Sequence, residues 1–235
     1  MSRTNLVSSA TRLLLCTALL WSCQNEQPPA EAPPKLFAEL FVRYIAPQGS
    51  LKATATFLKG DSLGAAKPIE LKQPALFQGQ PMEARYLPNN YVRYSAERRI
   101  PFKKGYTFSF KGAGSEKPHE VQLALDPIDS FSIAGGTASL SDGMQLVIPG
   151  ERLEEGESIV LLFSNAQNQA TTITLTNPAA RDTFKVAPIR LRKLKPGPHR
   201  MYLVKKQHRI HDFEEGTAQA DIEYYTREQP FRVVE

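Results

Sequence analysis

The chain has 235 residues, a formal net charge of +5, and 41 % hydrophobic and 23 % charged residues. This composition excludes an intrinsically disordered protein and allows one large domain or two smaller ones. Two of the basic residues, Arg3 and Arg12, lie in an N-terminal export segment, so the rest carries 27 basic and 24 acidic residues, or +3. That mild excess argues against nucleic acid as a partner, because binding its backbone requires a basic stripe.

Residues 1–22 have the three parts of a secretory signal. Arg3 and Arg12 flank a polar start, Leu13 to Trp21 form an apolar run, and Ser22 is a small residue before Cys23. The apolar run is far shorter than the roughly 20 residues that span a membrane. We therefore expect an export signal and no transmembrane anchor.

The segment Leu19-Leu20-Trp21-Ser22-Cys23 resembles the lipobox of bacterial lipoproteins. Leu20 and Ser22 fit that pattern, whereas Trp21 departs from it. The resemblance implies cleavage before Cys23 and attachment of fatty acids such as palmitate to the protein there. The only other cysteine is Cys16, inside the signal, so we expect neither a disulfide nor a thiolate metal site after Cys23.

Residues 23–35 predict a tether, because QNEQPPAEAPPK offers four prolines and no branched aliphatic or aromatic residue to bury. Gln24 is not the aspartate that retains enteric lipoproteins at the inner membrane, so the resemblance implies the outer membrane. Glu26 is similar to the acidic export signal of surface lipoproteins in Bacteroidota. Both a periplasmic and a surface-facing orientation stay open.

The rest of the chain predicts an all-β protein, since short alternating segments recur between turn residues and no long helical period occurs. The clearest strand is Leu51 to Leu58, whose apolar residues alternate with lysine and threonine. Its inward set is Leu51, Ala53, Ala55 and Phe57. Other strands are expected at 37–45, 82–87, 91–96, 106–110, 120–125, 130–133, 138–140, 144–148, 158–163, 171–175, 184–186, 189–191, 200–204, 218–225 and 231–234.

These strands suggest two successive β-sandwich domains, residues 36–126 and 127–235, because Asp126-Pro127 interrupts the pattern. A sequence echo supports the division. Lys103-Lys104-Gly105-Tyr106 precedes one pair of strands and Leu194-Lys195-Pro196-Gly197 precedes another. Both resemble the last hairpin of immunoglobulin-like or fibronectin-like domains, which implies that fold for each half.

No phosphate loop, nucleophile elbow, zinc-protease helix or calcium loop occurs, and no cofactor is expected. The one weak candidate for a metal site is His208, His211 and Asp212, with Glu214 and Glu215 nearby. The two histidines converge only if the chain turns there, because residues three apart on a strand point to opposite faces. A metal-dependent envelope enzyme using residues 208–215 is therefore the alternative function.

Two groups of residues could form a surface for a ligand or partner. The first is a basic run without acids, which includes Arg190, Arg192, Lys193, Lys205 and Lys206, and which strand pairing could gather on one face. The same charges could simply protect exposed strands from edge pairing. The second group is Tyr86, Tyr91 and Tyr94 around the turn at Asn89-Asn90; these rings could bind a ligand or pack within the sheet.

These observations favour a non-enzymatic binding or scaffolding lipoprotein of the cell envelope. It resembles the Bacteroidota lipoproteins that carry tandem immunoglobulin-like domains behind a lipidated cysteine. Its expected partners are the membrane, through the lipid on Cys23, and an envelope protein or a glycan.

Overall fold

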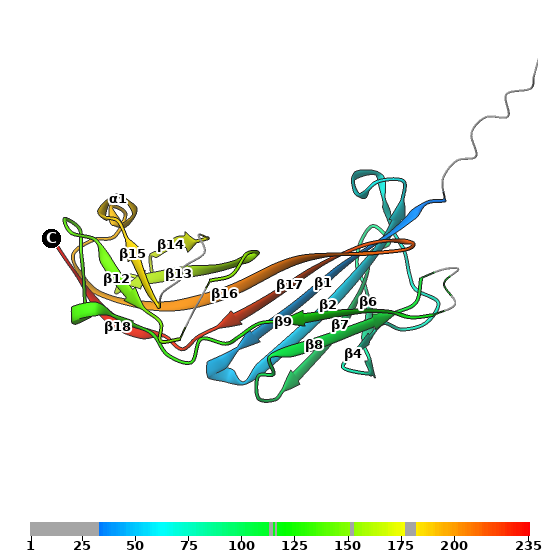
Figure 1. Cartoon of the computed structure of the whole chain (residues 1–235), viewed down its shortest axis with the longest axis horizontal. Helices are drawn as coiled ribbons and strands as arrows, with labels where there is room; N and C mark the ends of the chain where they lie inside the picture. Colours follow the sequence, from blue (N-terminus) through cyan, green and yellow to red (C-terminus); the bar gives the residue numbers. More distant parts are fainter. Residues whose placement is uncertain (1–32, 113–114, 116, 151–152, 177–181) are drawn as a thin grey trace, which may run out of the picture. The chain divides into compact units, whose positions relative to one another are not determined.

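The structure, a computed structural model, describes residues 33–112, 115, 117–150, 153–176 and 182–235. The expected all-β class is confirmed, with strands in three sheets and one short α-helix in the described residues (Figure 1). Contacts divide the chain into residues 1–33 and 34–235, and only the second unit is described below. No helix in the described part of the chain is long and apolar enough to cross a membrane.

The largest sheet, sheet A, has the strand order β11-β18-β16-β17-β1-β2-β7-β6, with β13 and β14 continuing from the other edge of β16 and β3 pairing with β2. Its strands are β1 (Lys35–Ile45), β2 (Ser50–Gly60), β3 (Lys67–Pro68), β6 (Glu83–Tyr86), β7 (Val92–Arg99), β11 (Thr137–Ser139), β13 (Glu157–Asn165), β14 (Ala170–Leu175), β16 (Gly197–Phe213), β17 (Gly216–Tyr225) and β18 (Gln229–Val234).

Two smaller sheets are separate from sheet A. Sheet B has the order β5-β4-β8-β9, with β4 (Leu76–Phe77), β5 (Gln80–Pro81), β8 (Gly105–Phe110) and β9 (His119–Ala124). Sheet C has the order β10-β12-β15, with β10 (Ser132–Ile133), β12 (Met144–Val147) and β15 (Thr183–Val186). Three short 3₁₀ turns cover Ala46–Gln48, Leu63–Ala65 and Ala134–Gly136.

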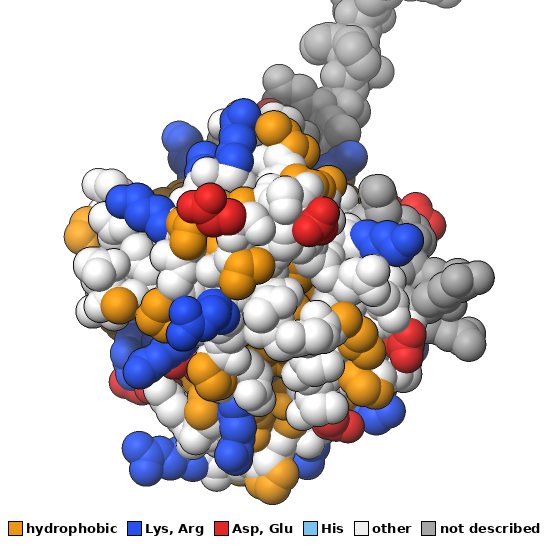
Figure 2. Space-filling model, turned by 90° about the vertical axis from the view of Figure 1, so that its left-hand side faces the viewer, with side chains coloured by type: hydrophobic (Ala, Val, Ile, Leu, Met, Phe, Trp, Pro, Cys, Tyr) orange, Lys and Arg blue, Asp and Glu red, His pale blue; other side chains and the backbone are white. Residues whose placement is uncertain are grey.

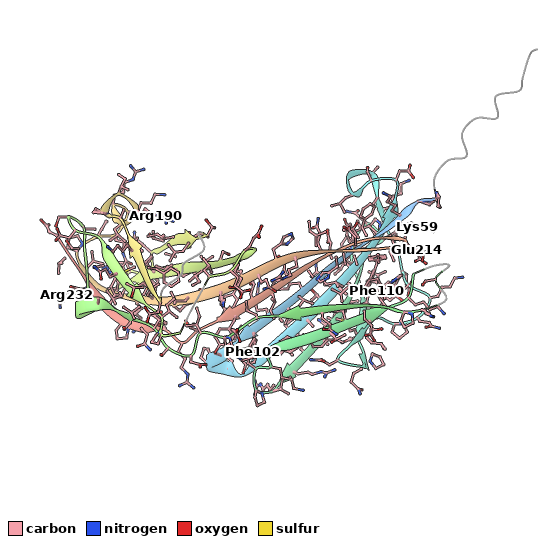
Figure 3. All side chains as sticks on the ribbon, in the orientation of Figure 1. Lys59, Phe102, Phe110, Arg190, Glu214 and Arg232 are labelled. Atoms are coloured by element: carbon pink, nitrogen blue, oxygen red, sulfur yellow. The ribbon has the colours of Figure 1, made fainter. Side chains whose placement is uncertain are left out.

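The core follows the alternation seen in the sequence. The inward residues of β2 are Leu51, Ala53, Ala55 and Phe57, and all are buried as expected. Phe57 contacts Phe110 of sheet B at a ring distance of 4.9 Å, so the two sheets pack face to face. Phe110 and Phe102 lie at different places along this core (Figure 3), and Phe102 packs edge-on against Tyr44 and Tyr224.

The expected hairpin after Lys103 is present as β8 and β9, paired antiparallel from Gly105 with Ala124 to Phe110 with His119. Buried Tyr106 near its start accepts a hydrogen bond from the Lys103 N–H (3.0 Å), which ties the strand to the turn before it. The second copy of the echo lacks this bond: Tyr202 is half-buried and stacks on Tyr225 instead. Only the first copy therefore has a hydrogen bond from the turn to the tyrosine of the following strand.

The expected strand at residues 189–191 is wrong, because that segment is the α-helix α1 (Pro188–Leu191). Pro188 stands at the start of the helix, where its missing N–H leaves no bond unmade and its fixed φ suits a helix. The helix buries Leu191 and exposes Ile189.

Strand β16 differs most from expectation. It has 17 residues, whereas the alternation had indicated only 200–204. Its first part pairs with β13 and β18, and its last part pairs with β17. At about 3.3 Å per residue it is roughly 55 Å long, and Figure 3 shows Arg190 near one end and Glu214 just beyond the other.

Strand pairing crosses the expected domain boundary at Pro127. Strand β17, from the second half of the chain, pairs in parallel with β1 from Leu36 with Gly216 to Ile45 with Tyr225. The two halves thus share sheet A, which the sequence did not predict. A parallel pair between distant segments has no local signal, since no short turn joins its strands.

Candidate functional site

Cys23 lies outside the described residues, so its acylation remains a prediction from the sequence. The other candidate residues are placed by the structure. They do not form one site.

The two candidate metal-binding histidines lie on opposite faces of β16. His208 is opposite Asp221 of β17, and its Nδ1 is 2.9 Å from Asp221 Oδ1. His211, three residues later, points inward; burial, aided by the charge of Arg209, lowers its pKa. Because the strand continues to Phe213 and does not turn, His208, His211 and Asp212 do not converge. No group of three potential metal ligands occurs among the described residues.

The basic run is distributed over several surfaces. Arg190 on α1 donates a hydrogen bond to the Thr174 carbonyl, while Arg192 and Lys193 are exposed beside it. Lys205 points into the interior, and Lys206, the next residue along β16, points outward to Glu223. Figure 2 shows Lys and Arg side chains in several separate groups on its face, with neutral and apolar side chains between them. Among the described residues, strand pairing therefore does not gather these charges on one face.

The three tyrosines also separate. Tyr94 is buried, and its hydroxyl accepts a hydrogen bond from the Leu71 N–H (2.9 Å), so it is part of the core. Tyr86 is 70 % exposed and donates to Glu70 (2.7 Å), while Tyr91 is partly exposed on the same hairpin. Tyr86 and Tyr91 therefore remain accessible.

The strongest candidate site is a cleft of about 750 Å³. The sequence had not predicted it, although Lys205 was among the candidate residues. The inward side chains of β16 form its floor, and the end of β9 with the following segment forms one wall. The segment before β13 forms the other wall. The lining residues are Lys104, Gln122, Ala124, Leu125, Asp126, Pro127, Ile128, Asp129, Ile148, Pro149, Gly150, Glu154, Glu157, Lys205, Gln207 and Arg209.

The floor is polar because the inward side chains of β16 change from apolar to polar along the strand. Met201 and Leu203 point inward and are buried in the core, whereas the next inward positions are Lys205, Gln207 and Arg209. Side chains two apart on a strand share a face at roughly 7 Å spacing, so these three form a row. This change from apolar to polar at a constant period of two is the sequence signal that could have revealed the site.

A buried ion pair stands at one end of the row. Lys205 Nζ lies 3.4 Å from Glu157 Oε2, and both side chains are almost fully buried. The Glu154 N–H donates to the same Glu157 oxygen (3.0 Å). These contacts offset part of the cost of holding two charges away from water.

Gln207, next in the row, is only 6 % exposed and lines the cleft. Its side-chain amide makes no hydrogen bond with the described residues. The amide atoms are not among the buried polar atoms that lack a partner, so they are open to the cleft. Two donors and an acceptor are thus available to whatever occupies the cleft.

The rim of the cleft carries charges of both signs. Lys104 Nζ binds Asp126 Oδ1 at 2.6 Å, and this hydrogen bond lowers the pKa of Asp126. Arg209, Asp129 and Glu154 make no ion pair with the described residues. The buried side chains of Ile128 and Ile148 form an apolar part of the cleft wall. The cleft can therefore hold a ligand that has both hydrogen-bonding and charged groups, and its described lining includes no serine, threonine, cysteine or histidine.

No protein-family model matches the chain, and no curated protein is similar enough in sequence to identify a relative.

Proposed function

We propose that the protein is a lipoprotein of the cell envelope, attached through acylated Cys23, that binds a polar ligand in the cleft formed by β9 and β16. Binding, with no chemical conversion of the ligand, is the role that the cleft supports best. The lipobox-like segment and the proline-rich tether of the sequence support the attachment. An outer-membrane location and immunoglobulin-like domains belong to the same proposal.

Gln207 is the observation that carries the binding role. Its side chain lies at the floor of the cleft beside the ion pair of Lys205 and Glu157, and its amide makes no hydrogen bond with the described residues. The amide atoms are not among the buried polar atoms that lack a partner, so they are open to the cleft. A bound ligand that donates to and accepts from this amide replaces water there. The ligand also displaces water from the apolar wall near Ile128.

One experiment in the intact cell tests both ligand binding in the cleft, by crosslinking, and acylation of Cys23, by fatty-acid labelling. A photo-reactive amino acid replaces Gln122, on the wall of the cleft, or Thr54, on the opposite side of sheet A, as the control. The same cells are fed a clickable fatty acid, and a second strain carries Cys23→Ala.

We expect a discrete adduct from position 122 and none of the same size from position 54. We also expect fatty-acid label on the wild-type chain alone, with the Cys23→Ala chain released into a soluble fraction. Label on the Cys23→Ala chain would disprove the lipid attachment. The absence of an adduct specific to position 122 would disprove binding in the cleft.

A further inference from the structure

Strand β9 is the last strand of sheet B and has one unpaired edge. The Leu125 N–H donates to the Lys104 carbonyl (2.9 Å), and the register continues with Leu123 opposite Tyr106. Residues of an antiparallel strand alternate between bonding one neighbour and facing away from it. The backbone groups of Glu120, Gln122 and Ala124 therefore point away from β8, toward the free edge.

The position beyond this edge faces the polar row of β16. Strand β9 lies next to β17 of the facing sheet, and β16 follows β17 in sheet A. Strands within a sheet are about 4.8 Å apart, so one more strand beside β9 would lie over β16. The described residues of sheet B provide no such strand, and the inward side chains of Gln207 and Arg209 face the cleft there.

From this arrangement we infer that the cleft takes an extended peptide, which adds to sheet B as a strand beside β9. Gln122 and Ala124 exchange backbone hydrogen bonds with the peptide, as in other cases of strand addition. Alternate peptide side chains point down to the row on β16, where the Gln207 amide can donate to them and accept from them. This inference rests on the proposed binding function and names its ligand class.

Charge further defines the peptide. Arg209 has no ion pair with the described residues and stands on the floor of the cleft. A peptide side chain over Arg209 is best acidic, because a guanidinium and a carboxylate form two parallel hydrogen bonds. The ligand is therefore an extended segment with an aspartate or glutamate among its inward side chains.

The test uses a displayed library of random peptides, selected on the chain from Cys23 onward with Cys23→Ser to avoid acylation. Binding of the selected peptides is measured by titration calorimetry. Ala124→Pro removes the one backbone N–H at this edge position without touching a bond to β8, and proline is tolerated at such edge positions. Ala124→Ser keeps the N–H and is the matched control, and Arg209→Glu reverses the charge on the floor.

We expect selected peptides to carry an acidic residue and to bind about tenfold more weakly to Ala124→Pro, since one hydrogen bond contributes up to about that factor. Ala124→Ser should bind as the parent chain does. Arg209→Glu should weaken the acidic peptides and should bind their lysine-substituted versions better than the parent chain does.

Amide hydrogen exchange of the parent chain keeps the inference testable if Ala124→Pro does not fold. Peptide should slow exchange at Gln122 and Ala124 but not at Ala84, which lies on β6, an edge strand of sheet A. Failure to enrich any peptide, or binding that leaves exchange at Gln122 and Ala124 unchanged, would overturn strand addition. A glycan adduct from position 122 in the cell would then leave the proposed function standing with another ligand, whereas no adduct at all would remove both.

Discussion

Glu223 is the acid on which several side chains of the outward face of sheet A converge. Its side chain is 11 % exposed and accepts hydrogen bonds from Lys206 and from the Tyr225 hydroxyl (2.8 Å). Arg43 approaches from β1, with Nε 3.5 Å from Glu223 Oε2. Burial alone would raise the pKa of Glu223, but these donors and the charges of Lys206 and Arg43 hold it below its ordinary value of 4.5. Burial and the bond to Glu223 together raise the pKa of Tyr225 to about 12.

The lowered pKa of Glu223 predicts a stability difference that depends on pH. A carboxyl with a pKa lower in the folded than in the unfolded chain stabilises the fold above pH 4.5, and this stabilisation is lost as the pH falls through the folded value. Near neutral pH, Glu223→Gln should reduce the free energy of unfolding by about 1.5–3 kcal/mol, the range for hydrogen bonds to charged groups. Denaturant titrations should show this difference shrinking in acid. Glu97→Gln, which breaks the exposed pair with Lys52, is the control and should have a much smaller effect; a Glu223→Gln difference that is independent of pH would contradict the assignment.

At the scale of single residues, the sequence predicted chemistry less well than it predicted burial. The inward position of Leu51 follows from alternation alone, whereas Lys205 was expected in a basic surface group and is buried. What alternation cannot show is that Lys205 finds Glu157, which lies 48 positions earlier and meets it through the pairing of β13 with β16. Lys205, Gln207 and Arg209 occupy alternate positions in the sequence, but they were not predicted to form a row. They form the floor of a cleft only because another sheet faces them.

At the scale of elements, the start of β17 depends on a residue with no side chain. A Cβ added to Gly216 would lie 1.7 Å from the Leu36 carbonyl oxygen, so β1 and β17 meet there without room for any other residue. Gly216→Ala must push the two strands apart. Overpacking of this kind typically costs about 1–3 kcal/mol.

We therefore expect Gly216→Ala to lower the free energy of unfolding by at least that range and to speed amide exchange at the start of β1. Gly64→Ala is the matched control, because nothing lies within 4 Å of its Cβ and the effect should be small. Equal stability of the two variants in denaturant titrations would show that the close approach of β1 and β17 is not maintained in solution.

Strands in which buried apolar residues alternate with polar ones could be predicted from the sequence, and β2 is the clearest case. The length of β16 was not, because its polar inward residues and exposed Ile210 remove the apolar alternation after Leu203 while the pairing with β17 continues. The segment at 189–191 was expected as a strand because it is short and its apolar residues, Ile189 and Leu191, alternate with Arg190. Pro188 starts a helix there, and periodicity cannot separate the two over three residues.

At the scale of the whole described unit, β16 and β17 connect the two halves of the chain. Strand β17 covers one side of β1 along its length, and its inward residues Ala218, Ala220, Ile222 and Tyr224 are buried in the core of the first half. Without β17 that side of β1 is a free edge, and part of the core is exposed. Burial of each large apolar side chain contributes about 1.5–3 kcal/mol, against a net stability of roughly 5–15 kcal/mol for a domain.

This arrangement predicts that residues 23–126 do not fold when they are produced alone. Loss of Ile222, Tyr224 and the ten paired positions of β17 should remove most of the net stability, so thermal unfolding followed by circular dichroism should show no cooperative transition. Co-production of residues 127–235 as a separate chain should restore a complex, since it supplies β16 and β17 in trans; the two chains should then purify together and melt as one. A cooperative transition for residues 23–126 alone would instead show that the first half is an independent domain, and that β17 adds to a fold which is already complete.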